Sequence, residues 1–311
     1  MKNSNQTQKK FEGILDRHFE GVLEDHPVMA NELGLRAGEG RLGEMGLRFE
    51  WRQEMRRQQT LTDLDALPVN ELSPEQHLDR LALRSMVLGE CEDFDRYVHR
   101  LEPDAVDRVF GILLHELQRG EDEPTRAKRN MRGVLRATPR YLSQAARMID
   151  RPENVWRRIM QQTVAGAGAL FDAAQSFLGE KDIKLIASAQ RAVGRYHDAV
   201  MDRPLAPRNS FALGTNLLQR RVRDELGLDY TLGQVEALAL AESVRIGRLL
   251  KQACARHGRN KSPEVIIDQA RANWNPSGDL LDVYRSETKR VANGFKAAEA
   301  VTFPKGDELQ V

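Results

Sequence analysis

The residues that come closest to a catalytic motif are His115-Glu116-Leu117-Gln118. In a zinc metallopeptidase helix, two histidines four residues apart bind the metal, and the glutamate after the first histidine acts as general base. Arg119 stands where the second histidine is needed. The motif is therefore incomplete and predicts no metal site.

The other histidines are scattered, and no two of them lie three or four residues apart: His18, His26, His77, His99, His197 and His257. The fold can in principle gather three of them into a site, but histidines in the core or in solvent are the better interpretation. We assign no catalytic or metal-binding residue from the sequence, and the substrate-binding residues stay unknown.

Two other patterns fall short of a site. No strand precedes Gly166 and Gly168, and no Lys-Ser/Thr follows them, so they do not form a phosphate-binding loop. We predict instead that they allow close helix packing. Ser210 and Ser277 fall in predicted loops without the pattern of a nucleophile elbow.

Basic residues are concentrated between Arg126 and Arg158, where ten Lys and Arg stand against only Asp150 and Glu153. Such a stretch can be an anion-binding face for phosphate or nucleic acid. Alternatively, the arginines form ion pairs with acidic side chains in the first part of the chain, because residues 1–125 carry 26 acidic and 16 basic side chains. Aromatic residues are nearly absent from the stretch, so we favour pairing and expect no nucleic-acid partner.

The composition is that of a folded protein with room for about two domains. The chain has 311 residues, 41% of them hydrophobic, and a net charge of +1, which excludes disordered and low-complexity classes. The polar start shows no signal peptide, and no apolar run is long enough for a membrane span. Cys91 and Cys254, each in a helical pattern, suit buried thiols in a reducing compartment. We expect a cytoplasmic location and no membrane partner.

Two helices have clear start signals. Ser73 is an N-cap residue, Pro74 occupies the first turn, and Gln76 is the capping-box partner of Ser73. Apolar residues then recur at steps of three and four up to Leu101. This predicts a helix of up to about 30 residues. Thr231 and Gln234 form a second capping box, and Gly258 follows the end of that helix.

Helical periodicity extends over most of the remaining chain. It marks residues 8–24, 27–33, 44–59, 104–117, 123–149, 152–178, 181–201, 214–226, 263–272 and 278–300. We predict an all-α fold of long antiparallel helices that covers residues 1–299 and forms one wall of a cleft. The proline-marked break at 202–210 is the candidate boundary between two subdomains.

Residues 300–311 depart from this pattern. Val301 and Phe303 alternate with polar residues, a Pro-Lys-Gly turn follows, and Leu309 and Val311 alternate again. This predicts a short β-hairpin-like segment. Two strands alone are marginal in water, so we expect these four apolar residues to form a partner interface, as if the chain ended inside a larger structure.

Several segments carry a family resemblance in their order and spacing: residues 11–19, 26–34, 78–84, 138–162 and 211–214. The most specific are Gly227-Leu-Asp-Tyr-Thr-Leu-Gly233, before a long helix, and the closing Val301-Thr-Phe-Pro304. Together they resemble the N-terminal half of the bacterial family catalogued as domain of unknown function 885.

The resemblance implies a helical fold like that of zinc carboxypeptidases and oligopeptidases, with a deep cleft between two helical halves. Family members are about twice as long. They carry a His-Glu-x-x-x-Gly-His helix in the second half, where two histidines and a downstream acid would bind zinc and the glutamate would activate water. No position here matches that helix, so zinc is expected only in a C-terminal half that this chain lacks.

We therefore expect the N-terminal helical part of a zinc metallopeptidase-like protein, without activity on its own. Its expected partners are a C-terminal half on a separate polypeptide, a second copy of this chain, or a peptide substrate. The alternative is a non-catalytic helical module that binds a protein or serves as a scaffold.

Overall fold

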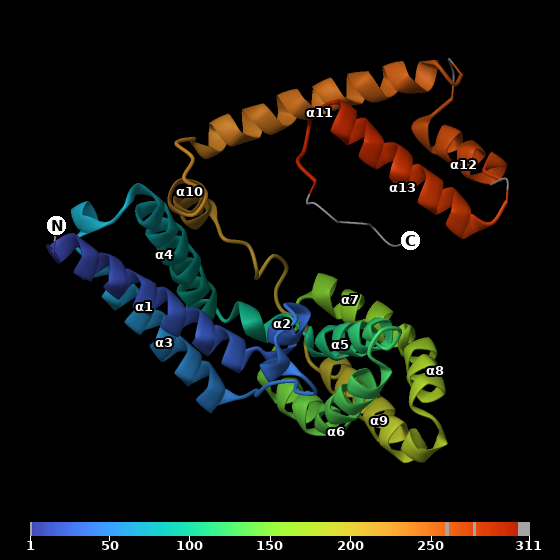
Figure 1. Ribbon diagram of the computed structural model, residues 1–311, viewed down its shortest axis with the longest axis horizontal. Helices are drawn as coiled ribbons and strands as arrows, with labels where there is room; N and C mark the ends of the chain where they lie inside the picture. Colours follow the sequence, from blue (N-terminus) through green and yellow to red (C-terminus); the bar gives the residue numbers. More distant parts are fainter. Residues whose placement is uncertain (1, 259–260, 276–277, 304–311) are drawn as a thin grey trace. The chain divides into compact units, whose positions relative to one another are not determined.

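The structure, a computed structural model, describes residues 2–258, 261–275 and 278–303. These residues form 13 α-helices and four short 3-10 helices, with no strand among them, which confirms the all-α prediction (Figure 1). The chain divides into a first unit, Met1–Tyr230, and a second unit, Thr231–Val311. The α-helices of the first unit are α1 (Lys2–Asp25), α2 (Pro27–Glu32), α3 (Leu47–Asp65), α4 (Pro74–Asp95), α5 (Ala105–Arg119), α6 (Pro124–Met148), α7 (Asn154–Ala165), α8 (Ala167–Leu178), α9 (Ile183–Met201) and α10 (Thr215–Asp224).

Helices α1, α3 and α4 form one layer of the first unit. Their shared core contains Phe11, Ile14, Leu64, Leu83 and Val87. The predicted capping box of α4 is present, since Gln76 N donates to Ser73 Oγ at 3.2 Å and Ser73 N donates to Gln76 Oε1 at 3.3 Å. The helix ends at Asp95, earlier than predicted, and Tyr97 then takes a left-handed conformation with φ of 55°.

Helices α5 to α9 form a second layer around a larger core, which includes Val109, Ile112, Leu135, Phe171 and Val193. Helices α6 and α9 run parallel. Arg132 Nη2 and Asp182 Oδ2 are 2.9 Å apart near their starts, and Ala206 N donates to Pro152 O just beyond their ends.

Gly166 separates α7 from α8, where the sequence predicted one helix over residues 152–178. A Cβ on Gly168 would meet no atom within 4 Å. The prediction that these two glycines allow close helix packing is therefore wrong at Gly168.

The second unit contains α11 (Leu232–Ala255), α12 (Pro263–Asn273) and α13 (Leu280–Ala297). Each helix begins at a side-chain cap, from Thr231, Ser262 and Asp279 respectively, and the capping box predicted at Thr231 is present. None of the residues in these three helices is buried. An amphipathic helix in water is stabilised mainly by burial of its apolar face. The apolar side chains of these three helices are not buried by the described residues.

The predicted C-terminal hairpin is wrong within the described residues. Helix α13 ends at Ala297, and Val301 and Phe303 follow in irregular backbone. Alternating side chains alone do not make a strand, because a strand needs a neighbour for its backbone hydrogen bonds, and the described part of the chain contains none. The predicted strand positions Leu309 and Val311 lie outside the described residues.

Candidate functional site

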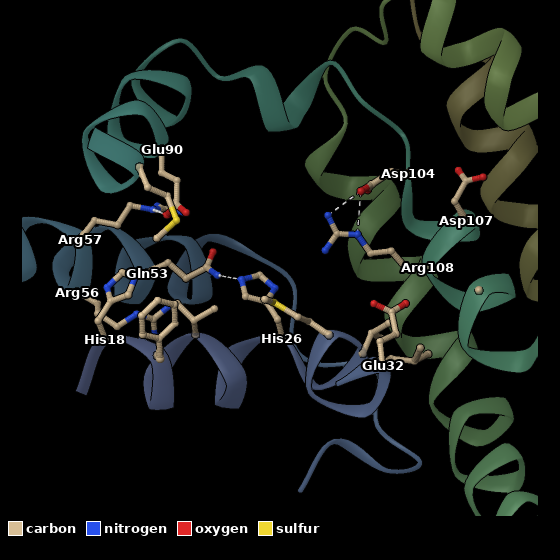
Figure 2. Close-up of a pocket in the computed structure, with 17 residues that line it drawn as sticks. His18, His26, Glu32, Gln53, Arg56, Arg57, Glu90, Asp104, Asp107 and Arg108 are labelled. Atoms are coloured by element: carbon tan, nitrogen blue, oxygen red, sulfur yellow. Dashed lines mark hydrogen bonds and ion pairs between the residues drawn. The ribbon is translucent and has the colours of Figure 1, made fainter. Parts of the chain in front are cut away.

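A groove in the first unit contains a cavity of about 580 Å³. One wall comes from α1, α3 and α4, and the facing wall comes from α2 and the start of α5 (Figure 2). A second cavity of about 260 Å³ shares six of its lining residues, so the two form one groove: His26, Gln53, Arg57, Glu90, Asp104 and Arg108. The size is typical of a small-ligand site.

Two histidines and a glutamine line the first wall. His18 is only 2% exposed, and its Nδ1 lies 3.2 Å from Thr60 Oγ1. The Thr60 hydroxyl donates to Arg56 O, so it accepts from His18 Nδ1, and the lone pair of the neutral ring is on Nε2. That Nε2 has no hydrogen-bond partner among the described residues. Gln53 Nε2 lies 2.8 Å from His26 Nε2 and donates to it.

Burial lowers the pKa of His18, His26 and His99 from the ordinary value of 6.5. An imidazolium loses hydration when it is enclosed, so the neutral ring is favoured. At His18 the nearby Glu90 opposes this effect, whereas Arg56 and Arg57 add to it. The groove therefore presents neutral imidazoles at pH 7.

Acidic residues line the facing wall. Arg108 donates to Asp104 Oδ2 from Nε at 2.8 Å and from Nη2 at 2.6 Å, and Thr163 Oγ1 donates to Asp107 Oδ1 at 2.6 Å. Burial raises the pKa of Glu102, and the negative charges of Asp104 and Asp107 raise it further. Asp104 and Asp107 lie at the N-terminus of α5, where the positive end of the helix dipole stabilises their negative charge.

The arginines of the first wall are already engaged. Arg56 Nη1 donates to Asp25 Oδ2 and to Gly21 O. Arg57 Nε donates to Glu90 Oε2 at 2.9 Å, and its Nη1 donates to Glu54 Oε2 at 3.3 Å. These cations are thus neutralised by acids of their own wall.

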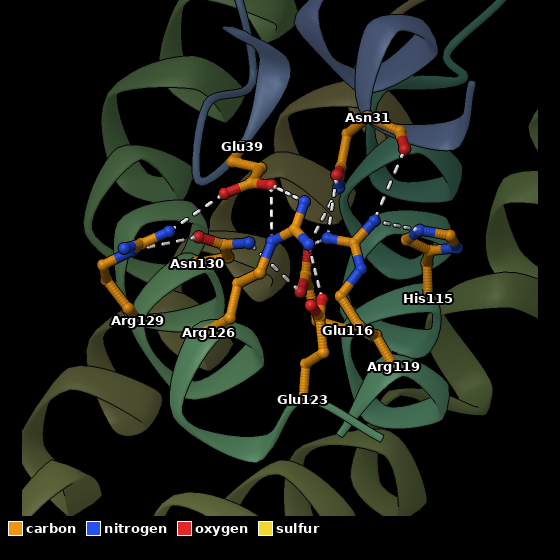
Figure 3. A network of polar contacts seen from close by, with 9 residues as sticks. All are labelled: Asn31, Glu39, His115, Glu116, Arg119, Glu123, Arg126, Arg129 and Asn130. Carbon is orange, nitrogen blue, oxygen red and sulfur yellow. Dashed lines mark hydrogen bonds and ion pairs between the residues drawn. The ribbon is translucent and has the colours of Figure 1, made fainter. Parts of the chain in front are cut away.

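A buried polar network joins α2, α5 and α6 (Figure 3). The fully buried Glu116 accepts from Asn31 Nδ2 and Arg119 Nη1, each at 2.9 Å, and from Asn130 Nδ2 at 3.5 Å. Arg119 Nη1 also donates to Asn31 Oδ1, and its Nη2 lies 2.8 Å from His115 Nε2. A buried carboxylate is tolerated only when it is paired and hydrogen-bonded. The incomplete motif therefore holds helices together.

Glu39 extends this network from the loop before α3. Its carboxylate accepts hydrogen bonds from Arg126 and Arg129 of α6, and the bond from Arg126 lowers the Glu39 pKa. The loop approaches α6 so closely that a Cβ on Gly133 would lie 2.6 Å from Gly40 O. The predicted pairing of the basic stretch with the first part of the chain is confirmed for these two arginines. Other basic residues of the stretch are exposed: Arg136, Arg140 and Arg147.

The described residues provide no group of three or more His, Cys, Asp and Glu side chains that could hold a metal ion. A metal ion does not fit the incomplete motif at His115, because Arg119 occupies the place of the second histidine and is bound to Glu116. The zinc that the family resemblance implies belongs to a half outside this chain and stays a prediction. Both cysteines are free. Cys91 is buried, as predicted, and burial raises the pKa of its thiol to about 12; Cys254 is only half-buried.

The other predicted positions are not among the residues that line the groove. Val301 is exposed, and the ring of Phe303 lies beside Lys296, with 5.0 Å between Nζ and the ring centroid. Ser277 is outside the described residues. In the described part of the chain, no helix has the length and apolar character needed to cross a membrane.

Sequence reasoning missed most of the groove. It singled out His18 and His26 as histidines, but not Gln53, Asp107 or Arg108. The sequence did show several acidic residues just before α5. Such residues predict negative charge near the start of a helix, but they do not predict which side chains lie on the opposite wall.

Fold and groove together define an all-α protein with a polar groove between two helical layers. The chain belongs to the DUF885 family, described as bacterial protein of unknown function, which matches residues 27–308. This confirms membership of the family, while the assignment to its N-terminal half and the peptidase chemistry stay predictions.

One solved structure is similar to this chain, that of "a putative lipoprotein of unknown function" from Shewanella oneidensis, with 12% sequence identity and a TM-score of 0.58. The match covers 95% of this chain and 59% of that chain, so this chain spans less than two thirds of the neighbour's length. At this identity the likeness shows the fold alone. No curated protein matches the sequence significantly.

We predict that Arg119→Met lowers the free energy of unfolding by about 3–5 kcal/mol, because Glu116 then stays buried without its cation. Arg158→Met is the matched control, since Arg158 is exposed, and it should change stability by less than about 0.5 kcal/mol. Adding Glu116→Gln to Arg119→Met should restore part of the loss. Urea unfolding measures all three, and equal effects of the two arginine variants would contradict the role of the network.

The lowered histidine pKa values predict that stability falls as the pH drops below about 6.5. In that range the unfolded chain binds protons that the folded groove excludes, so the free energy of unfolding declines by up to about 1.4 kcal/mol per pH unit for each histidine. Urea unfolding between pH 7.5 and 5.5 measures this slope. His18→Asn keeps a donor for Thr60 and should flatten it, and an unchanged slope would refute the assignment.

Proposed function

We propose that this chain is the N-terminal helical part of a zinc metallopeptidase-like protein and that its groove holds a peptide against one wall of the cleft. The observation that carries the proposal is the groove itself, whose facing walls combine apolar side chains with hydrogen-bonding groups. An extended peptide needs both, because its backbone donors and acceptors must be satisfied where its side chains are buried.

The lining residues match this need. Phe19, Val22, Met29 and Met86 offer apolar surface, and Phe19 is 45% exposed even though it borders the groove. His18 Nε2 offers an unused acceptor. A bound peptide would supply the missing donor and cover the exposed ring.

We propose that a partner polypeptide supplies the catalytic metal site. It would correspond to the part of the longer structural neighbour that this chain does not match. Such a partner would also cover the apolar side chains that α11 and α13 expose, including Leu238, Val244 and Leu281. We derive no catalytic step from the residues of this chain.

The second candidate is a non-catalytic peptide-binding module. It is favoured by the location of the groove, because every residue that lines it belongs to the first unit. In this case the chain binds peptides as it is, and no partner adds hydrolysis.

Binding and hydrolysis of a fluorescently labelled peptide library by the purified chain test the proposal. We expect saturable binding without cleavage, and cleavage only after the partner polypeptide is added. Binding that never leads to cleavage favours the module. Cleavage by the chain alone with one tightly bound zinc ion, or no peptide binding at all, would contradict the proposal.

A further inference from the structure

We infer that the groove recognises an organic cation, an alkylammonium or guanidinium group on an aliphatic stem. This inference rests on the proposed function and names the class of ligand that the groove selects. In a peptide, the cation would be a lysine or arginine side chain.

The groove carries acidic side chains that have no cation as an ion-pair partner. Its three arginines are paired: Arg56 with Asp25, Arg57 with Glu90, and Arg108 with Asp104. On the facing wall, Glu32 and Glu102 make no ion pair among the described residues, and Asp107 accepts a hydrogen bond from the neutral Thr163 hydroxyl. Arg108, which is paired with Asp104, also attracts Glu102 without contacting it, so one guanidinium serves two carboxylates. The groove thus keeps negative charge that its own cations do not neutralise.

The opposite wall carries an uncharged acceptor without a partner. His18 is 98% buried at the edge of the cavity, its Nδ1 donates to Thr60, and its Nε2 lone pair has no partner. An unpaired buried acceptor is unfavourable, and a donor on a ligand would satisfy it. The His18 Nε2 lone pair and the carboxylates of Glu32 and Glu102 are acceptors that need a donor, and ammonium and guanidinium groups carry only donors. Arg56 Nε, on the same wall as His18, is a buried donor without a partner among the described residues.

Apolar side chains also line the cavity. Val22, Met29 and Met86 line the cavity together with the partly exposed ring of Phe19. The methylene stem of a long cationic side chain packs well on such a surface while its head reaches polar groups. An aromatic face also attracts a cation.

Calorimetric titration of the full chain tests the inference with three probes. They are the blocked peptide Ala-Ala-Lys-Ala-Ala, the same peptide with Gln in place of Lys, and free cadaverine, which carries the cation without a peptide. We expect the Lys peptide to bind at least about tenfold more tightly than the Gln peptide, as a charge-assisted contact predicts. We also expect cadaverine to compete with it.

Two variants locate the effect. Glu102→Gln and Asp107→Asn each keep the side-chain shape and should weaken the Lys peptide by about tenfold while the Gln peptide is unchanged. Glu121→Gln removes an exposed carboxylate outside the groove and should change neither affinity. Circular dichroism confirms that each variant is folded.

Each outcome separates the inference from the proposed function. Equal binding of both peptides overturns the inference and leaves peptide binding intact. Binding of cadaverine alone supports the cation site and contradicts the peptide function. If the Lys peptide binds more tightly than the Gln peptide but neither groove variant changes this preference, the groove is not the cation site and the inference is overturned. If no probe binds, the inference and the proposed function are both overturned.

Discussion

The buried Glu116 carboxylate is the constraint on which the first unit depends. It lies in α5, and its hydrogen-bonding partners come from α2, α5 and α6. A charge without solvent fixes its partners far more strictly than an apolar contact does, because any gap leaves it uncompensated. Asn31 is adjacent to Glu32, so the network also fixes the wall of the groove that α2 and the start of α5 share. The network therefore positions the facing wall of the groove, and α1, α3 and α4 form the opposite wall.

Two kinds of surface remain unsatisfied around this frame, and they differ in chemistry. In the groove, His18 Nε2 lacks a donor, and Glu102 and Asp107 make no ion pair among the described residues, so the groove suits a small polar ligand. On α11 and α13 the unsatisfied surface is apolar and extends over several turns, so the need is for a protein surface. The two units therefore expose surfaces of different chemistry, a polar groove in the first unit and apolar helix faces in the second.

Local rules predicted much of the fold but little of the groove. The capping boxes at Ser73 and Thr231 and the all-α class follow from neighbouring residues, and the structure confirms them. Helix α4 ends at Asp95 because the backbone turns into a left-handed conformation at Tyr97. No strand forms at Val301 because the described residues offer no neighbouring strand. The sequence showed that the motif at His115 is incomplete. It did not show that Glu116 is a buried hydrogen-bond acceptor, because its partner Asn31 is 85 residues away in the chain.

Hydrogen exchange of the full chain, with and without saturating Lys-containing peptide, tests the groove as the binding site most directly. The account predicts slower exchange in three segments that line the facing walls, residues 18–29, 53–57 and 102–111, and no change in the exposed basic face of α6. Protection confined to α6 or to the second unit, with unchanged exchange around the groove, would contradict it.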